Sequence, residues 1–172
     1  MRRKPQSIPI PAAPTISAIL IDGANVIASG PTRARERLDL ALCWLKAWQP
    51  TLPIEIFLDH STFLRCRAEV QAELQTCQTA TAGKALVVLC HAGLAADIPL
   101  LHRAAEVGGL ILSNDRFFDH TALRANAMTL QFTLDRLDFI PAQEVTWFRS
   151  KGMSLRIPIA NLLVRRLVKP AD

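Results

Sequence analysis

The sequence lacks the cysteine patterns that bind zinc or build a disulfide framework. Its four cysteines include no C-x-x-C pair and no cysteine–histidine spacing of a zinc site, so we expect core thiols. The glycine-rich loops of dinucleotide-binding enzymes and P-loop NTPases are also missing, which argues against both classes. No aromatic series predicts an exposed surface for base stacking.

No apolar run is long enough to span a bilayer, so we expect no membrane partner. The basic start is followed by four prolines (Pro5, Pro9, Pro11 and Pro14) and not by the apolar core of a signal peptide. We therefore expect an extended arm over residues 1–16 and a soluble, cytoplasmic protein. The main domain is expected over 17–148, followed by a basic amphipathic tail over 149–172.

What is present is enough apolar sequence for one core. The chain has 172 residues, of which half are hydrophobic, and this predicts one folded domain. Its formal net charge of +5 favours a polyanionic partner. The sequence leaves the oligomeric state open, and a homodimer is compatible with it.

Short apolar runs alternate with segments of helical periodicity along most of the chain. This alternation predicts a three-layer α/β/α sandwich around a central parallel sheet. Strands are expected at 18–21, 54–58, 85–90, 110–112 and 127–133, and helices at 35–48, 61–77, 97–107 and 116–123. The segment from 134 to 147 has no regular pattern.

Aspartates recur where the predicted strands end. Asp22, Asp59 and Asp115 directly follow strands, Asp97 opens a helix after another strand, and Asp119 lies one helical turn beyond Asp115. Because crossovers between parallel strands share one hand, the strands' carboxyl ends meet at one edge. The sequence therefore predicts that these carboxylates converge there, where α/β sheets bind ligands.

Converging carboxylates repel one another unless a cation lies between them. Their hard oxygen atoms suit Mg²⁺ or Mn²⁺, which can activate water and stabilise a phosphodiester transition state. Asn25 would orient that water or a phosphate. The competing interpretation is that an aspartate after a strand caps a helix or forms a turn, and this fully explains Asp59, the secondary candidate.

Arginines near these acids are candidates for binding a nucleic-acid backbone. Three of them, Arg33, Arg35 and Arg37, lie where a loop enters the first long predicted helix. The fourth, Arg116, follows Asp115 directly.

Two segments carry a resemblance to a known family. The sequence I-D-G-A-N-V at 21–26 and the sequence G-G-L-I-L-S-N-D-R-F-F-D at 108–119 resemble the NYN branch of the PIN-like nucleases. Over about Ser17 to Pro141, the chain is most similar to the Regnase-type endoribonuclease domain of CCCH zinc-finger ribonucleases. That domain often has two adjacent acids where this chain has Ala96-Asp97, and no CCCH finger is present here.

The resemblance implies a Mg²⁺- or Mn²⁺-dependent endoribonuclease that acts on single-stranded or structured RNA. It implies that Asp22, Asp97, Asp115 and Asp119 hold the metal and that Asn25 supports them. Two alternatives stay open. The site would act equally on DNA, or the domain is a nucleic-acid-binding or interaction module whose catalysis has decayed, with Ala96 as its first sign.

Overall fold

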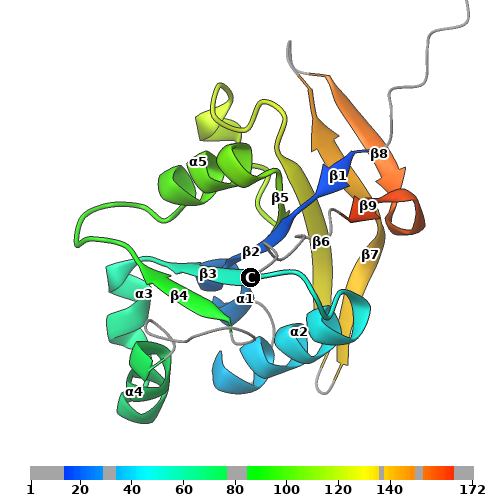
Figure 1. Cartoon of the computed structure of the whole chain (residues 1–172). Helices are drawn as coiled ribbons and strands as arrows, with labels where there is room; N and C mark the ends of the chain where they lie inside the picture. Colours follow the sequence, from blue (N-terminus) through cyan, green and yellow to red (C-terminus); the bar gives the residue numbers. More distant parts are fainter. Residues whose placement is uncertain (1–13, 29–33, 77–84, 136–137, 150–152, 165–172) are drawn as a thin grey trace, which may run out of the picture.

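The computed structural model describes residues 14–28, 34–76, 85–135, 138–149 and 153–164, and its main feature is a seven-stranded sheet (Figure 1). The strands are β1 (Thr15–Ile16), β2 (Ala18–Asp22), β3 (Ile54–Leu58), β4 (Leu86–Leu89), β5 (Gly109–Leu112), β6 (Met128–Asp135), β7 (Asp138–Phe148), β8 (Ser154–Pro158) and β9 (Leu163–Val164). The helices are α1 (Gly23–Ala28), α2 (Ala34–Trp48), α3 (His60–Arg65), α4 (Ala68–Thr76) and α5 (Asp97–Val107), with short 3-10 helices η2 (Phe118–His120) and η4 (Ile159–Asn161). None of these described helices is long and apolar enough to cross a membrane.

The strands of the large sheet follow the order β4-β3-β2-β5-β6-β7-β8. The first five are parallel to their neighbours, which confirms the predicted parallel sheet and places their carboxyl ends at one edge. Strands β7 and β8 are antiparallel and extend the sheet beyond β6 (Figure 1). Strands β1 and β9 pair separately, in a small parallel sheet.

Helices cover both faces of the parallel part, so the fold has the predicted three layers. On one face, Ala41 and Leu45 of α2 belong to a buried cluster with Ile19 and Leu112 of the sheet. On the other face, α5 contributes to a second buried cluster that includes Leu20. Strands buried from both sides need apolar residues at every position, which is why β2 is an uninterrupted apolar run up to its final aspartate.

An ion pair ties α5 to the sheet away from the carboxyl edge. Arg103 of α5 donates from Nε and Nη2 to the carboxylate of Glu55 in β3, with the shortest contact at 2.7 Å. Glu55 is buried, and a paired arginine is what makes a buried carboxylate tolerable. The same guanidinium contacts Glu106, one turn along α5, at 3.0 Å, so Arg103 lies between two carboxylates.

Two elements differ from the sequence prediction because a local backbone signal outweighs side-chain periodicity. The apolar stripe over 61–77 predicts one helix, but Cys66 is extended (φ −70°, ψ 153°) and separates α3 from α4. The expected helix over 116–123 is reduced to η2 and turns, since Phe117 has a left-handed backbone (φ 49°). Asp119 therefore does not lie one α-helical turn beyond Asp115.

The antiparallel strands also differ from expectation. Residues 138–148, expected to be irregular, form β7, whose pairing with β6 shifts register between Leu130 and Phe132. That irregularity breaks the alternation by which an antiparallel strand is recognised in a sequence. Strand β8 continues the sheet beyond residue 148, inside the segment that the sequence predicts to be a basic tail.

Candidate active site

Asp22 is the buried centre of the candidate site. It ends β2, and its side chain is 5% exposed. Helix α1 begins at the very next residue, because Gly23 has no side chain. A Cβ atom there would lie 2.8 Å from the carbonyl oxygen of Phe57 in the neighbouring strand. The absence of a side chain at Gly23 thus lets α1 pack closely on β3 directly after Asp22.

Two hydrogen bonds fix this carboxylate. The backbone N–H of Asn25 donates to Oδ1 at 3.0 Å, and the hydroxyl of Ser113 donates to Oδ2 at 2.7 Å. Burial nevertheless raises the pKa of Asp22 to about 6, and the negative charges of Asp97 and Asp115 act in the same direction. Asp22 is therefore a carboxylate whose ionised form would be favoured by a neighbouring cation.

Ser113 and Asn25 hold the segment after β5 against the end of β2. Ser113 Oγ accepts a hydrogen bond from the Asp115 backbone N–H at 3.0 Å, and the Asn25 side-chain oxygen accepts one from Asn114 N–H at 2.9 Å. The oxygen of Asn25 thus positions the segment carrying Asp115, whereas the sequence predicted that it would orient water or phosphate. No role was expected for Ser113, although it belongs to the S-N-D segment of the resemblance.

Asp97 is the second member of the site. It is the first residue of α5, and burial raises its pKa. The negative charge of Asp115 raises this pKa further, and those of Asp59 and Asp119 do so more weakly. His120 opposes this effect, and its Nε2 lies 3.8 Å from Asp97 Oδ2. Asp115 and Asp119 are exposed. The fold therefore brings Asp22, Asp97 and Asp115 within electrostatic range of one another, with Asp119 near Asp97.

Asp59 follows β3 as Asp22 ends β2, but its environment is that of a helix cap. Its Oδ1 accepts hydrogen bonds from Thr62 N–H at 2.8 Å and from the Ser61 hydroxyl at 2.5 Å. Partial burial raises the pKa of Asp59, but these hydrogen bonds outweigh burial and lower it overall. The structure thus supplies the capping role that competes with a metal role. The cap is Asp59 itself and not Ser61 or Thr62.

A cleft borders Asp59 and Asp97 at the carboxyl edge. A cavity of about 400 Å³ is lined by Ala24, Asp59, Ala96 and Asp97, among others. Within the described part of the chain, no group of three or more His, Cys, Asp or Glu side chains is arranged to hold a metal ion. The donor chemistry still suits a hard cation, because carboxylates that raise one another's pKa are stabilised by positive charge. Mg²⁺ in particular uses one or two carboxylates and keeps several waters.

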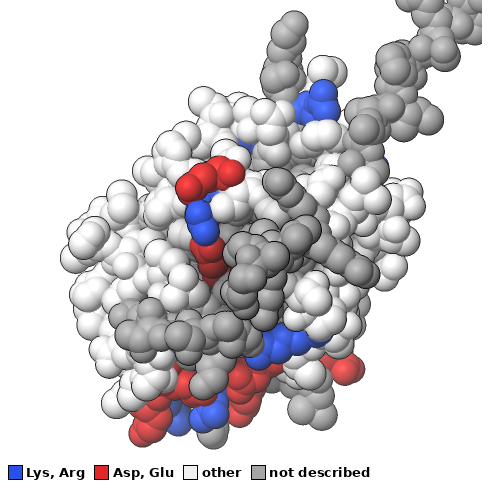
Figure 2. Space-filling model, in the orientation of Figure 1, with Lys and Arg blue, Asp and Glu red and all other residues white. Residues whose placement is uncertain are grey.

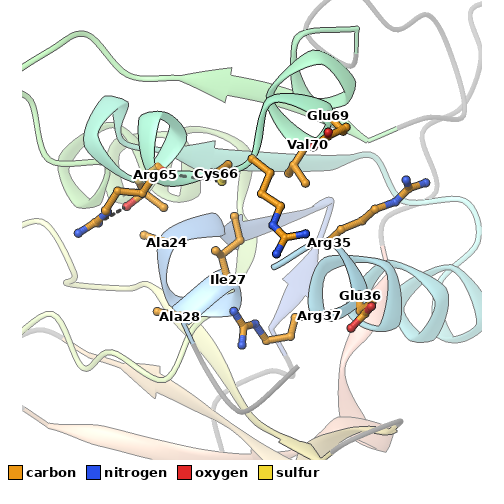
Figure 3. A pocket seen from close by; sticks show the side chains of 12 residues that line it. Ala24, Ile27, Ala28, Arg35, Glu36, Arg37, Arg65, Cys66, Glu69 and Val70 are labelled. Carbon is orange, nitrogen blue, oxygen red and sulfur yellow. Dashed lines mark hydrogen bonds between the residues drawn. The ribbon is translucent and has the colours of Figure 1, made fainter. Parts of the chain in front are cut away.

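Four arginines surround a larger cavity beside this cleft. Its volume is about 750 Å³, and Ala24 of α1 lines both cavities. Arg35 and Arg37 come from α2, as the sequence predicted, and Arg65 and Arg67 come from α3 and the residues after it (Figure 3). We call these four residues the arginine pocket. Arg33 lies outside the described residues.

The members of the arginine pocket differ in how their charge is compensated. Arg35 contacts Asp39 at 3.5 Å and Glu73 at 3.3 Å, and all three side chains are well exposed. Arg65 donates to the hydroxyl of Thr62 at 2.9 Å, a neutral partner that leaves its charge uncompensated by that bond. Arg65 and Arg67 carried no sequence signal, because the sequence predicted one helix over 61–77 and the break at Cys66 between them was not recognisable.

On one face of the molecule, charges of opposite sign lie next to each other. On the face seen in Figure 1, acidic and basic side chains are neighbours near α5 and along the edge formed by α2 and α4, and much of the rest is uncharged (Figure 2). Arg103 between Glu55 and Glu106 is one such neutralised group.

Comparison with known proteins supports the fold. No protein-family model and no curated protein sequence matches the chain. Among solved structures, the Arabidopsis thaliana nuclear protein-only RNase P 2 is similar over 81% of this chain and 35% of its own, with a TM-score of 0.54 and 15% sequence identity. This chain thus spans about a third of that protein. At this identity the likeness establishes a shared fold and confirms the predicted NYN/PIN-like architecture. The closer resemblance to Regnase-type domains stays a prediction.

Proposed function

We propose that this protein is a divalent-metal-dependent endoribonuclease whose site is built around Asp22. The observation that carries the proposal is the buried Asp22 carboxylate, held at the end of β2 within electrostatic range of Asp97 and Asp115. The raised pKa means that the ionised form of Asp22 costs free energy in the folded protein, and a bound cation would offset that cost. The fold shared with an RNase P supports RNA as the substrate.

In this proposal Asp22, Asp97 and Asp115 hold the ion, with Asp119 at the rim. Mg²⁺ or Mn²⁺ bound there would supply an activated water and stabilise the charge of the phosphodiester transition state. Ser113 keeps the Asp22 carboxylate in one orientation through its hydrogen bond to Oδ2. Asn25 and Ser113 together keep Asp115 next to it by binding the backbone of residues 114 and 115.

The arginine pocket supplies the binding of the RNA backbone. Its position next to Ala24 would let phosphates on one side of the scissile bond contact Arg37, Arg65 and Arg67 while the bond lies over the acids. Arginine suits this task because its planar guanidinium contacts phosphate through two N–H groups.

The test is to incubate single-stranded RNA and single-stranded DNA with the wild type in Mn²⁺ and in EDTA, and with two variants in Mn²⁺. Asp22→Asn is expected to abolish internal cleavage of RNA, and Asp59→Asn, its counterpart on the next strand, to retain it. Cleavage of DNA at the same rate would replace the ribonuclease with a general nuclease. Cleavage by Asp22→Asn at the wild-type rate would refute the assigned centre.

One observation favours a second candidate, a nucleic-acid-binding module without catalysis. The described acids form no ready group of three metal ligands, and Ala96, buried beside Asp97, offers no side-chain oxygen. This candidate predicts salt-sensitive binding of RNA and no cleavage at any Mn²⁺ or Mg²⁺ concentration. The same incubation therefore separates the two functions.

A further inference from the structure

The face of the sheet that α5 covers changes character from β2 to β8. A single row of paired residues runs across it, from Leu20 through Ile111, Thr129 and Thr146 to Arg156. Paired residues point to the same side of a sheet. Leu20 and Ile111 are fully buried beneath α5, whereas the Arg156 side chain is 76% exposed. The apolar face thus turns into a polar, basic surface over β6, β7 and β8.

Aromatic rings lie on this surface although the sequence shows no aromatic series. Phe148 is two residues beyond Thr146 in β7 and so shares its face, and Phe118 of η2 lies above the sheet with 63% of its surface exposed. The guanidinium of Arg124 lies over both rings, 4.9 Å from the centre of Phe118 and 4.8 Å from that of Phe148. We call Phe118, Arg124 and Phe148 the stacking platform.

The stacking platform is joined to the acidic site through one backbone carbonyl. Arg124 Nη1 donates to the carbonyl oxygen of Arg116 at 2.7 Å, and Arg116 directly follows Asp115. A guanidinium held flat by two rings and one carbonyl is a rigid surface. A base stacked on Phe118, which this guanidinium contacts, would therefore lie at a set distance from Asp115.

The cavity at the platform is small and basic. Its volume is about 220 Å³, and its described lining includes Arg116, Arg124 and Arg156 but no acidic residue. Outside the lining, Glu144 approaches Arg156 at 3.7 Å, an exposed contact of little strength. The hydroxyls of Thr129, Thr146 and Ser154 and the amide of Gln131 complete the lining. Flat rings, cations and neutral hydrogen-bonding groups together match a nucleotide, with its base, phosphate and sugar edges.

We propose that the stacking platform binds an unpaired base of a single-stranded nucleic acid, with Arg116 and Arg156 contacting the adjacent phosphates. The base stacks on the exposed ring of Phe118, a contact that a paired base inside a duplex cannot make without leaving its own stack. The role of this assignment in substrate choice rests on the proposed nuclease function. It makes single-stranded substrate the class that the enzyme accepts and places the platform and the arginine pocket on opposite sides of the cut.

Binding is best measured in the Asp22→Asn background, where RNA would stay intact. Fluorescence anisotropy would compare a single-stranded RNA of mixed sequence, its duplex, an abasic strand with the same number of phosphates, and the matching single-stranded DNA. We expect the RNA single strand to bind at least about tenfold more tightly than the abasic strand. Adding Phe118→Ala should remove that advantage, since base stacking on one aromatic ring contributes roughly tenfold or more.

Three controls separate stacking from charge and from folding. Ile140→Ala removes another exposed apolar side chain, at the other end of β7, and Lys46→Ala removes one exposed charge from α2. Both should leave the preference for bases over abasic sites unchanged. Phe118→Trp keeps a ring and should restore binding, which a merely structural defect in Phe118→Ala would not allow.

The outcomes distinguish a failure of the stacking platform from a failure of the proposed nuclease function. Equal binding of the RNA and abasic strands by the unaltered platform, or equal loss in Phe118→Ala and Ile140→Ala, overturns the platform. A duplex that binds as well as the single strand overturns it too. Phe118-dependent binding of bases in a protein that cleaves nothing in Mn²⁺ upholds the platform and refutes the nuclease. Comparable binding of RNA and DNA upholds base stacking and leaves RNA selectivity to the cleavage site.

Discussion

Strands β2 and β3 are neighbours, run in the same direction and both lead into a helix through an aspartate. Asp22 is almost fully buried with its pKa raised to about 6, whereas Asp59 caps α3 with its pKa lowered. The pKa values of two aspartates at equivalent places in the topology are thus shifted in opposite directions. The hydrogen bonds are not the difference, because each aspartate accepts one from the backbone N–H three residues on and one from a serine hydroxyl. The difference is burial and charge: Asp22 is more deeply buried and its pKa is raised further by Asp97 and Asp115, whereas Asp59 is partly exposed and Arg65 helps to lower its pKa.

The comparison shows that the surroundings of an aspartate at a strand end, and not its position alone, decide whether it suits a metal ion. A partly exposed carboxylate whose hydrogen bonds outweigh the effect of its burial is already stabilised as an ion and gains little from a metal. A carboxylate that is confined next to other acids is destabilised as an ion and gains much. By this criterion Asp22 is the centre of the site, and Asp59 is a structural residue at its border.

The largest expected contrast between the two is in catalysis. Asp22→Asn should lower the rate of RNA cleavage in Mn²⁺ by on the order of 1,000-fold, the equivalent of about 4 kcal/mol in the barrier. Asp59→Asn should lower it by about threefold at most. Single-turnover cleavage at saturating enzyme measures the chemical step alone. Similar losses in both variants would mean that the two aspartates share one role.

The next contrast is in the pH dependence of stability without metal. Since the folded pKa of Asp22 lies above its usual value, the folded protein keeps Asp22 protonated up to about pH 6, whereas the unfolded chain loses this proton from about pH 4 upward. Stability therefore falls between these two pH values, and the full cost is present above about pH 6. At neutral pH this cost is about 3 kcal/mol. Asp22→Asn should therefore be the more stable protein at pH 7 by about that amount and lose this advantage at pH 4. Urea unfolding at both pH values measures it, and an advantage of equal size at both would contradict the raised pKa.

The smallest contrast concerns the cap. Asp59→Ala should lower the free energy of unfolding by about 1 kcal/mol at pH 7, because α3 loses its N-cap. The sign of its pH dependence is opposite to that of Asp22, since a lowered pKa stabilises above the usual value and the effect fades as the pH falls. Asp59→Asn keeps an accepting oxygen and serves as the control, with a loss of only a few tenths of a kcal/mol. A stabilising Asp59→Ala would place Asp59 with the crowded acids.

Much of this molecule could be predicted from the sequence because its parallel part has unambiguous patterns. Strands β2 and β5 are apolar runs followed by polar residues, β3 is apolar except for Glu55, and α5 is bounded by Asp97 and the left-handed Gly108. Once these strands are recognised as parallel, their carboxyl ends lie at one edge of the sheet. The aspartates that follow them are then expected to lie near one another. Their catalytic and metal-binding roles stay predictions.

The parts that escaped prediction depend on contacts between distant residues. Strand β7 is defined by its pairing with β6, and its register shift hides the alternation in its sequence. The stacking platform brings Phe118 and Phe148, thirty residues apart, around Arg124, and no local pattern marks that meeting. The separate roles of Asp22 and Asp59 likewise depend on burial, which a strand-end position alone does not reveal.

The acids around Asp22 are proposed to hold a divalent cation, and Asp59 is not. Isothermal titration of Mn²⁺ into the wild type, Asp22→Asn and Asp59→Asn, at one pH near 7, tests this difference most directly. We predict that Asp22→Asn weakens Mn²⁺ binding by at least about tenfold, while Asp59→Asn stays within about threefold of the wild type. Equal Mn²⁺ affinity in the wild type and Asp22→Asn, or a loss confined to Asp59→Asn, would contradict the proposed metal site.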